Sequence, residues 1–244
     1  MKQISDPAGA VDGYLAEGGF PQYLKTGIAE YLQQIVNDIL YRDIVKRHNV
    51  RNIAVLEELV RCLFSNVANE YSIRNLSRIT NASSLHTITE FMGYLEDAYL
   101  FFSVPVFSYS FRQRSIKPRK VYSIDNGLTA SNTVSFTRDL GKMLENAVFI
   151  GLKRKFRDIF YFKGRGECDF VIRENNATHS VIQVCYQLTS ENLDRELRGL
   201  DEATGATRCS NALIVTRAES GEYRLPGGVV ARAIPIVEWF DMLC

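Results

Sequence analysis

The chain has 244 residues, of which 46% are hydrophobic, and its formal net charge is +1. This length and composition predict one large or two small packed domains and exclude a disordered chain. Because the charge is close to zero, any surface that binds nucleic acid must be a local basic patch.

Helical patterns occupy most of the first hundred residues. Gly18, Gly19 and Pro21 separate two short helical pieces within 11–26, and a longer apolar periodicity covers 27–48. Three further helices are expected, the last two with serine N-caps: Asn52–Asn66, Ser72–Ile79 and Ser84–Leu100. His86, near the start of the last helix, is expected to be exposed rather than to bind a ligand.

Two strand-like runs follow, Phe101–Ser110 and Lys120–Ile124. Three helices followed by a β-ribbon is the order of a winged helix, a helix-turn-helix variant. The ribbon tip carries five cations and no acid: Arg112, Arg114, Lys117, Arg119 and Lys120. These cations are predicted to contact DNA phosphates. A winged helix that binds protein, or that is purely structural, fits the same pattern, and both interpretations are open.

The second half of the chain alternates helices and strands. Asp125–Thr137 reads as a connecting loop and places the domain boundary. The expected helices are Asp139–Arg157, Leu193–Ala203 and Ile236–Leu243. The expected strands are Ile159–Lys163, Ala212–Thr216 and Val229–Ile234, with a turn region at Gly221–Gly228 between the last two. A hairpin over Lys163–Tyr186, which turns at Glu174–Thr178, follows the first strand. A helix between two strands implies a parallel crossover, so this half is expected to be α/β with a mixed sheet.

The hairpin carries the chemistry of this half. Side chains alternate across a strand, so Asp169 is expected beside Gln183 and Cys185. An acid on one strand and a polar-x-polar pair on the next is the layout of the PD-(D/E)XK nuclease core, where carboxylates bind a divalent metal and a Lys activates water. Here Gln183 replaces the second carboxylate and Cys185 replaces the Lys, leaving Lys153 and Lys163 as candidates for a displaced cation.

Several short motifs occur together in one order along the chain: Gly18-Gly19-Phe20-Pro21, Tyr41-Arg42-Asp43-Ile44, Leu95-Glu96-Asp97-Ala98-Tyr99-Leu100, Pro118-Arg119-Lys120-Val121-Tyr122, Ile124-Asp125-Asn126-Gly127, Leu144-Glu145-Asn146 and Glu167-Cys168-Asp169-Phe170-Val171. From about Val11 onward the chain resembles the C-terminal portion of a large prokaryotic family of AAA-type ATPases. In that family a P-loop ATPase precedes a winged helix and a domain of unknown function similar to the PD-(D/E)XK core. The resemblance implies that Glu145, Asp169 and Gln183 occupy nuclease core positions, and that Glu145 and Asp169 would hold Mg²⁺ if the site were functional.

Other sequence features exclude whole classes of activity. The chain contains no Gly-x-x-x-x-Gly-Lys-Ser/Thr motif, so by itself it is not expected to hydrolyse ATP. Its five cysteines are scattered without metal-binding spacing, which predicts reduced thiols and a cytoplasmic location. No apolar run approaches the ~20 residues of a membrane span, so no membrane partner is expected.

These observations predict an α+β / α/β chain in three parts: a helical lead-in at 1–48, a winged-helix module at 49–128, and a restriction-endonuclease-like α/β domain with a mixed central sheet at 129–244. The expected function is that of a non-catalytic accessory region of an AAA-type ATPase that recognises nucleic acid or a partner, with no cofactor of its own. Two alternatives stay open: a metal-dependent DNA nuclease at Glu145, Asp169 and Gln183, and a purely protein-interacting module whose partner is an ATPase domain or another protein.

Overall fold

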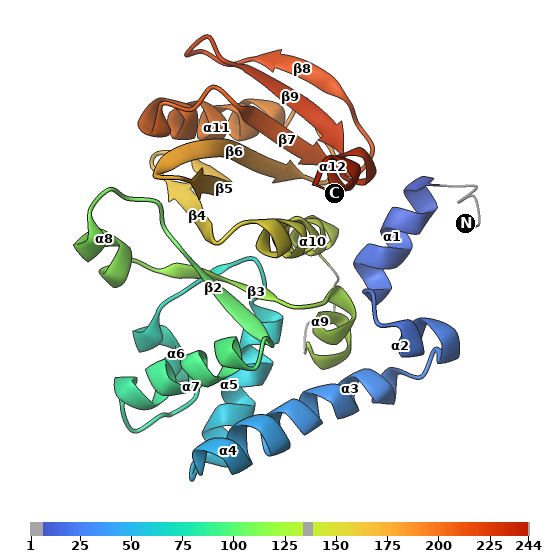
Figure 1. The fold of residues 1–244 in the computed structure, drawn as a ribbon, viewed down its shortest axis with the longest axis vertical. Helices are drawn as coiled ribbons and strands as arrows, with labels where there is room; N and C mark the ends of the chain where they lie inside the picture. The colour runs from blue at the N-terminus through green and yellow to red at the C-terminus, as the bar shows by residue number, and fades with distance from the viewer. Residues whose placement is uncertain (1–6, 134–138, 244) are drawn as a thin grey trace. The chain divides into compact units, whose positions relative to one another are not determined.

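The computed structural model describes residues 7–133 and 139–243 of the chain, and these belong to two compact units (Figure 1). Of the described residues, 14–103, 118–133 and 139 form the helical unit, and 7–13, 104–117 and 140–243 form the sheet unit. The sequence-based division has boundaries at 48 and 128, whereas the chain crosses between the two units after residues 13, 103, 117 and 139.

The helical unit contains most of the helices and a small sheet of order β1-β3-β2. Its elements are α2 (Pro21–Thr26), α3 (Ala29–Asp38), the π-helix η1 (Ile39–Val45), α4 (Lys46–His48), α5 (Ile53–Ser65), β1 (Glu70–Tyr71), α6 (Ile73–Ile79), α7 (Leu85–Asp97), β2 (Phe101–Pro105, which ends in the other unit), β3 (Arg119–Ser123) and α9 (Asn126–Asn132). The helix predicted over 27–48 is confirmed, with a π-helical stretch in its middle where Lys46 N–H donates to Tyr41 C=O. Ser72 and Ser84 cap α6 and α7 by accepting hydrogen bonds from Asn75 N and Thr87 N.

The loop predicted at Asp125–Thr137 is wrong for its first part, which forms α9; residues 134–137 lie outside the described residues. The buried Asp125 caps this helix, accepting from Gly127 N at 2.7 Å and Leu128 N at 3.1 Å. Its other oxygen accepts from Gly19 N at 2.8 Å. Gly18 has φ +74°, and a Cβ there would lie 2.2 Å from Asp125 Oδ1, so only glycine fits. The Asn126-Gly127 pair favoured a loop in the sequence, and the contact between Asp125 and Gly19 that supports the cap joins residues 106 positions apart.

The sheet unit is built on a six-stranded mixed sheet of order β4-β5-β6-β7-β9-β8. Its elements are α1 (Pro7–Glu17, which ends in the helical unit), α8 (Phe111–Ile116), α10 (Leu140–Lys155), β4 (Asp158–Lys163), β5 (Glu167–Glu174), β6 (Ala177–Cys185), α11 (Leu193–Thr207), β7 (Ala212–Thr216), β8 (Gly221–Arg224), β9 (Val230–Pro235) and α12 (Ile236–Leu243). Strands β4, β5 and β6 pair antiparallel, β6–β7 and β7–β9 pair parallel, and β8 pairs antiparallel with β9. The predicted mixed sheet is therefore confirmed, whereas the turn predicted at Gly221–Gly228 is wrong where β8 forms.

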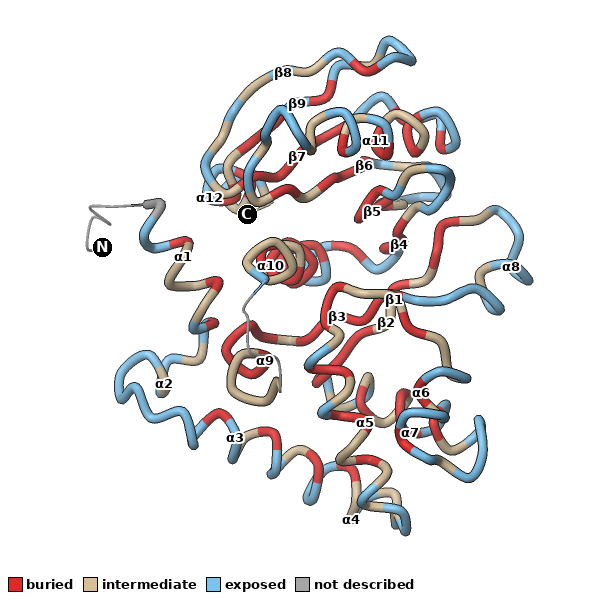
Figure 2. The backbone as a smooth tube through the Cα atoms, turned by 180° about the vertical axis from the view of Figure 1, so that it is seen from behind, coloured by how far each residue is buried: buried red, intermediate tan, exposed pale blue. Residues whose placement is uncertain are grey.

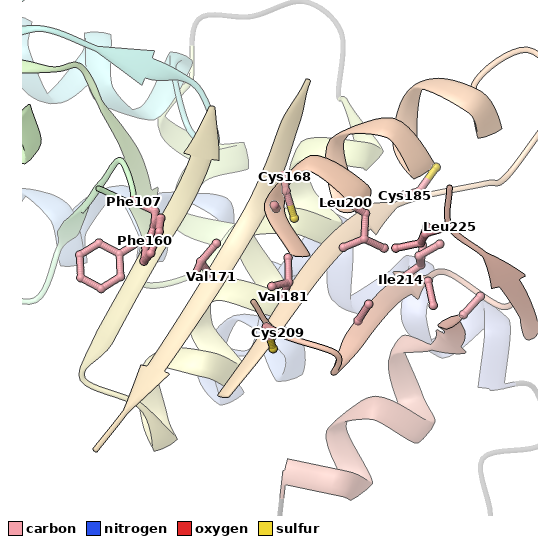
Figure 3. Close-up of a cluster of buried hydrophobic side chains, with 14 residues drawn as sticks. Phe107, Phe160, Cys168, Val171, Val181, Cys185, Leu200, Cys209, Ile214 and Leu225 are labelled. Atoms are coloured by element: carbon pink, nitrogen blue, oxygen red, sulfur yellow. The ribbon is translucent and has the colours of Figure 1, made fainter. Parts of the chain in front are cut away.

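Helices cover both faces of this sheet. The α11 face holds a buried apolar cluster that includes Val181, Cys185, Leu200 and Ile214 (Figure 3). On the other face, α10 packs through Phe149 against Phe170 of β5, with ring centroids 6.4 Å apart. Within the described residues, no helix has the length and apolar character needed to span a bilayer.

The strand predicted over Phe101–Ser110 is wrong beyond Pro105, where β2 ends. Val106 forms a parallel bridge with Tyr161 of β4, and Phe107 N donates to Tyr161 O at 2.6 Å. The chain then forms α8, which the sequence did not predict, before it enters β3. Pairing with the edge of the large sheet thus assigns 104–117 to the sheet unit.

An ion pair attaches the start of the chain to the same unit. Asp12 of α1 accepts from Arg217 Nε at 2.6 Å, from Arg217 Nη2 at 2.5 Å and from the Tyr186 hydroxyl at 3.0 Å. Arg217 also lies 5.8 Å from the Tyr186 ring centroid. Tyr186 and Arg217 directly follow β6 and β7, so Asp12 is held at the carboxyl ends of two parallel strands.

Candidate functional site

The hairpin of β5 and β6 brings two of the predicted site residues together. Phe170 lies opposite Ile182 in the antiparallel register, and continuing that register places Asp169 opposite Gln183. Asp169 is buried, and its Oδ2 accepts from Val184 N at 2.9 Å. The carboxylate thus replaces a backbone partner of β6 just beyond the paired residues Phe170 and Ile182. Both side chains lie on the face that α11 covers.

A third member of the cluster, Glu196 of α11, was not predicted. Glu196 is buried, and its Oε2 accepts from Gln183 Nε2 at 2.6 Å. Its Oε1 accepts from Arg195 Nη2 at 2.5 Å and from Arg195 Nε at 3.1 Å. The signal in the sequence was its place among the apolar positions of the helix, between Leu193 and Leu200, where a carboxylate faces the core rather than water.

Gln183 keeps one unsatisfied atom. The side chain is 6% exposed, and its Oε1 is the buried side-chain oxygen or nitrogen atom that lacks a hydrogen-bond partner among the described residues. A carboxylate accepts and does not donate, so the amide nitrogen must face Glu196 and the oxygen must face away. A buried acceptor without a donor costs about 1–3 kcal/mol. Gln183 Oε1 therefore offers a free acceptor inside this cluster.

Glu145, the remaining predicted site residue, comes from a different direction. It lies half-buried on α10, the helix that packs against Phe170. Phe170 follows Asp169 directly, so the two side chains point to opposite faces of β5. The structure thus joins Asp169 and Gln183 to Glu196 on one face, while Glu145 belongs to the helix on the other.

The cation that hydrogen-bonds Glu196 of this cluster is an arginine. Lys163, one expected candidate, lies 3.9 Å from the carboxylate of Glu167, and Lys153 lies on α10. Arg195 contacts the cluster directly, and its pKa is raised mainly by its hydrogen bond to Glu196 and, more weakly, by the negative charge of Asp169. An arginine stays protonated, so it cannot act as a base toward water.

Cys185 occupies the position where the resemblance would place a Lys. Burial, and then the negative charge of Glu196, raise the pKa of this thiol to about 11. Its Sγ donates to Gln187 O at 3.1 Å and accepts from Asn192 Nδ2 at 3.6 Å. Cys185 is therefore a protonated, buried side chain of the apolar cluster and not a nucleophile.

The cluster does not fit a divalent metal as its side chains lie. Mg²⁺ requires carboxylate oxygens together with water or substrate oxygens. Both oxygens of Glu196 already accept hydrogen bonds, and the guanidinium of Arg195 holds a positive charge where the metal's charge would be needed. Across 7–133 and 139–243, no three His, Cys, Asp or Glu side chains are grouped so that they could bind a metal. The predicted pair of Glu145 and Asp169 gains no third ligand there.

The predicted DNA-contacting residues divide by exposure. Arg112, Lys117 and Arg119 are exposed, and Arg114 is half-buried. Lys120 is 3% exposed, so the expectation that it contacts phosphate is not met. Lys120 begins the run of β3 that is buried on both faces and lies opposite Glu70 of β1, whereas Arg119 is the exposed first residue of the strand. The tip of the predicted ribbon is the helix α8 rather than a bare turn.

The start of α7, the predicted recognition helix, is open to solvent. His86 is exposed, as expected, and its Nε2 lies 3.7 Å from the carboxylate of Glu90. Ser84 and Thr87 share a hydrogen bond at 3.0 Å in addition to the cap. These polar groups are engaged with one another at the surface, and Glu90 keeps a negative charge on the same helix.

A family model for a domain of unknown function, DUF8612, matches residues 9–138, which is more than half of the chain. The chain belongs to the DUF8612 family. This match covers the helical unit except Asp139. It also covers residues 9–13 and 104–117 of the sheet unit.

Two curated relatives of this DUF8612 chain have similar sequences. An uncharacterized protein of Methanocaldococcus jannaschii, MJ1544, is 32% identical over 223 residues, which is 85% of this chain and 49% of the relative. An uncharacterized protein of Haemophilus influenzae is 27% identical over 205 residues, which is 77% of this chain and 50% of the relative. The chain thus spans about half the length of these relatives. No solved structure matches it.

Proposed function

We propose that this chain is a nucleic-acid recognition region that does not catalyse hydrolysis itself and that works with an ATPase located elsewhere. One observation carries the proposal: between Asp97 and Asp125 there is no acidic residue, and the cations Arg112, Lys117 and Arg119 in this stretch are exposed. Phosphates are bound by local groups of exposed Lys and Arg even where the net charge of a protein is small.

The topology of the helical unit supports a winged helix, and of these three cations Arg119 belongs to that unit. Helix α5 precedes β1, helices α6 and α7 follow it, and β2 and β3 complete a sheet of order β1-β3-β2. In such modules the last helix before the ribbon enters the major groove and the ribbon contacts the backbone. In this proposal α7 and β3, which begins with Arg119, have those roles in the helical unit, and Arg112 and Lys117 are phosphate contacts that the sheet unit adds.

The proposal assigns the sheet unit a nuclease-like scaffold without nuclease chemistry. An antiparallel β4-β5-β6 followed by a crossover helix to the parallel strand β7 accommodates that core. The site has Gln183 for a carboxylate and a neutral thiol at Cys185 for the Lys, and Arg195 neutralises Glu196. In the ATPases that the chain resembles, ATP hydrolysis belongs to a P-loop domain, and this sequence contains no P-loop motif.

A salt titration of DNA affinity tests the recognition role. Each phosphate that a cation neutralises lowers log affinity by roughly 0.9 per unit of log salt. Replacing Arg112 and Lys117 together with Ala is expected to flatten the slope by up to about two units without changing base preference. The matched control is Arg154→Ala with Arg224→Ala, two exposed cations elsewhere on the same unit, which is expected to leave the slope unchanged.

An unchanged slope in the Arg112/Lys117 double variant, or no DNA binding at low salt, rejects the proposal. Absence of DNA binding at low salt would favour a module that binds only protein. In that case Arg112 and Lys117 would form exposed ion pairs worth ~0–1 kcal/mol each, so the double variant would keep the stability of the unaltered chain.

A metal-dependent nuclease is the second candidate, favoured by the free acceptor Gln183 Oε1 beside two buried carboxylates; it requires Arg195 to release Glu196, because the side chains as they lie do not fit a divalent metal. It predicts DNA cleavage that requires Mg²⁺ or Mn²⁺ and disappears in both Asp169→Asn and Glu196→Gln. Asp194→Asn, an exposed carboxylate on the same helix as Glu196, is the control and should cleave normally. Cleavage that persists in the Asp169 variant comes from a contaminant, and the absence of metal-dependent cleavage by the unaltered chain rejects this candidate.

A further inference from the structure

The segment Ser108–Lys117, here called the α8 segment, exposes three large apolar side chains within a short stretch of sequence. Tyr109 is 71% exposed, Phe111 77% and Ile116 74%. Most residues of this segment are exposed (Figure 2), whereas Ile159, Phe160 and Tyr161 of β4, next to which the preceding residues pair, are buried. Single exposed apolar residues are ordinary on a protein surface, but three in one short segment mark a site of interaction.

The ring of Tyr109 packs against a buried ring, that of Phe107. Phe107 is buried and packs edge-on against Phe160 of β4, with ring centroids 6.0 Å apart; both belong to the apolar cluster of Figure 3. Tyr109 packs edge-on against Phe107 at 5.2 Å. The backbone of Phe107 is held on β4 by its hydrogen bond to Tyr161. Tyr109 is therefore orientated by the core of the sheet unit although most of its own surface meets solvent.

Phe111 is supported by a cation. The guanidinium carbon of Arg114 lies 5.9 Å from the Phe111 ring centroid and 5.8 Å from that of Phe160. Arg114 is half-buried and thus sits between one exposed ring and one buried ring. The same core residue, Phe160, supports both exposed rings, one through Phe107 and the other through Arg114. Rings held in this way lose little entropy when a ligand covers them.

The charge around the rings selects the ligand. Arg112 and Lys117 are exposed on either side of Arg114, and no acid occurs from residue 98 to residue 124. A positive segment that also displays flat rings fits a polyanion whose own flat groups are accessible. Paired bases are stacked inside a duplex, so a duplex offers these rings no base face, whereas a single strand does.

We infer that Tyr109 and Phe111 form a stacking platform for the bases of single-stranded nucleic acid, with Arg112 and Lys117 contacting its phosphates. This inference rests on the proposed recognition of nucleic acid and names its substrate class. Base stacking on an aromatic side chain tolerates any base, so the platform is expected to bind without strong sequence preference.

Fluorescence anisotropy with a labelled oligo(dT) strand and a labelled duplex tests the inference. At equal salt the single strand is expected to bind more tightly. Tyr109→Ala and Phe111→Ala are each expected to weaken oligo(dT) binding by about five- to 150-fold, the effect of losing one stacked base. The salt slope should stay the same in both, because neither variant removes a charge. Phe111→Trp, which keeps a larger ring, should retain the affinity.

Ile116→Ala is the matched control, because Ile116 is as exposed as the two rings and apolar but has no π-face. It is expected to leave oligo(dT) affinity unchanged. If Ile116→Ala weakens binding as much as Phe111→Ala does, the segment acts as a general apolar surface and the inference is wrong. Vesicles containing phosphatidylserine are the third probe: tight binding to them, abolished by Phe111→Ala and by Ile116→Ala, overturns the inference in favour of a lipid surface.

The outcomes also separate this inference from the function on which it rests. Salt-dependent duplex binding that the ring variants do not change overturns the platform and leaves the proposed function standing. Failure to bind either nucleic acid removes both. Folding is monitored in each variant through the fluorescence of Trp239, the single tryptophan, which is buried on α12 in the same unit.

Discussion

The contact between Gln183 and Glu196 predicts a strong thermodynamic coupling between β6 and α11. Replacing Glu196 with Leu removes the hydrogen-bond acceptor of Gln183 Nε2. Both Nε2 and Oε1 of this buried amide then lack a hydrogen-bond partner. We expect a loss of about 1–3 kcal/mol in the free energy of unfolding, the usual cost of an unsatisfied buried group. Arg195 adds little to this loss because its side chain is 78% exposed and regains water.

The matching change, Gln183→Leu, removes the free oxygen together with the amide. Glu196 keeps Arg195 but loses its short hydrogen bond from Nε2, and bonds to charged groups are worth about 1.5–3 kcal/mol. In the double variant no polar atom of the pair remains, and replacing a buried polar pair by apolar side chains is often neutral or stabilising. The double variant is therefore expected to be more stable than either single variant, with a coupling of about 1–3 kcal/mol.

Urea unfolding followed by the fluorescence of Trp239 measures this cycle within the sheet unit. The control cycle pairs Gln183→Leu with Asp194→Leu. Asp194 is an exposed acid of the same helix as Glu196, so this cycle should be additive within about 0.3–0.5 kcal/mol. Additivity in the Gln183–Glu196 cycle would refute the reasoning, because it would mean that the amide and the carboxylate do not depend on each other in the folded chain.

Three further predictions concern other contacts. Asp125→Ala should lower the stability of the helical unit by about 2–4 kcal/mol in urea unfolding followed by circular dichroism, since it removes the cap of α9 and the bond to Gly19; a loss no larger than that of an ordinary surface substitution would contradict this. The hydrogen bond from Arg217 lowers the pKa of Asp12, so this pair should stabilise the fold above the ordinary Asp pKa of about 4 and lose that contribution as the pH falls through the lowered value; the unfolding midpoint of Asp12→Asn should lack this dependence. Cys185, with its pKa at about 11, should resist iodoacetamide at neutral pH until urea is added, as mass spectrometry of its peptide would show.

Elements with strong local periodicity could be predicted from the sequence. The helices α5, α6, α7 and α10 and the hairpin of β5 and β6 were predicted with end residues close to those observed. Strand β8 was missed because Gly221 and Gly228 border a short run with only one strongly strand-forming residue, Tyr223. Its pairing with β9 is tertiary, and tertiary context overrides weak local preference.

The site shows the same division between local and remote information. Strand alternation predicted that Asp169 and Gln183 would be neighbours, because only the hairpin register is involved. Glu196 could not be found in this way, since its contact with Gln183 depends on how α11 returns across the sheet after β6. The same is true of Asp125, whose partner Gly19 lies 106 residues earlier in the chain.

The insertion of Val104–Lys117 into the sheet unit has a consequence for the protein during its synthesis. A growing chain emerges from the ribosome N-terminus first at about 5–20 residues per second, and domains tend to fold as they emerge. Once Asp139 has emerged, every residue of the helical unit is present. Phe107 then lacks its packing partner Phe160, because β4 has not yet been synthesised. For those seconds the apolar residues of 104–117 are exposed between two parts of the folded helical unit. Chaperones bind exposed segments of this kind. A gene fragment that stops at the end of the helical unit would make that temporary state permanent, so the first unit expressed alone is expected to aggregate unless 104–117 is replaced by a short polar turn.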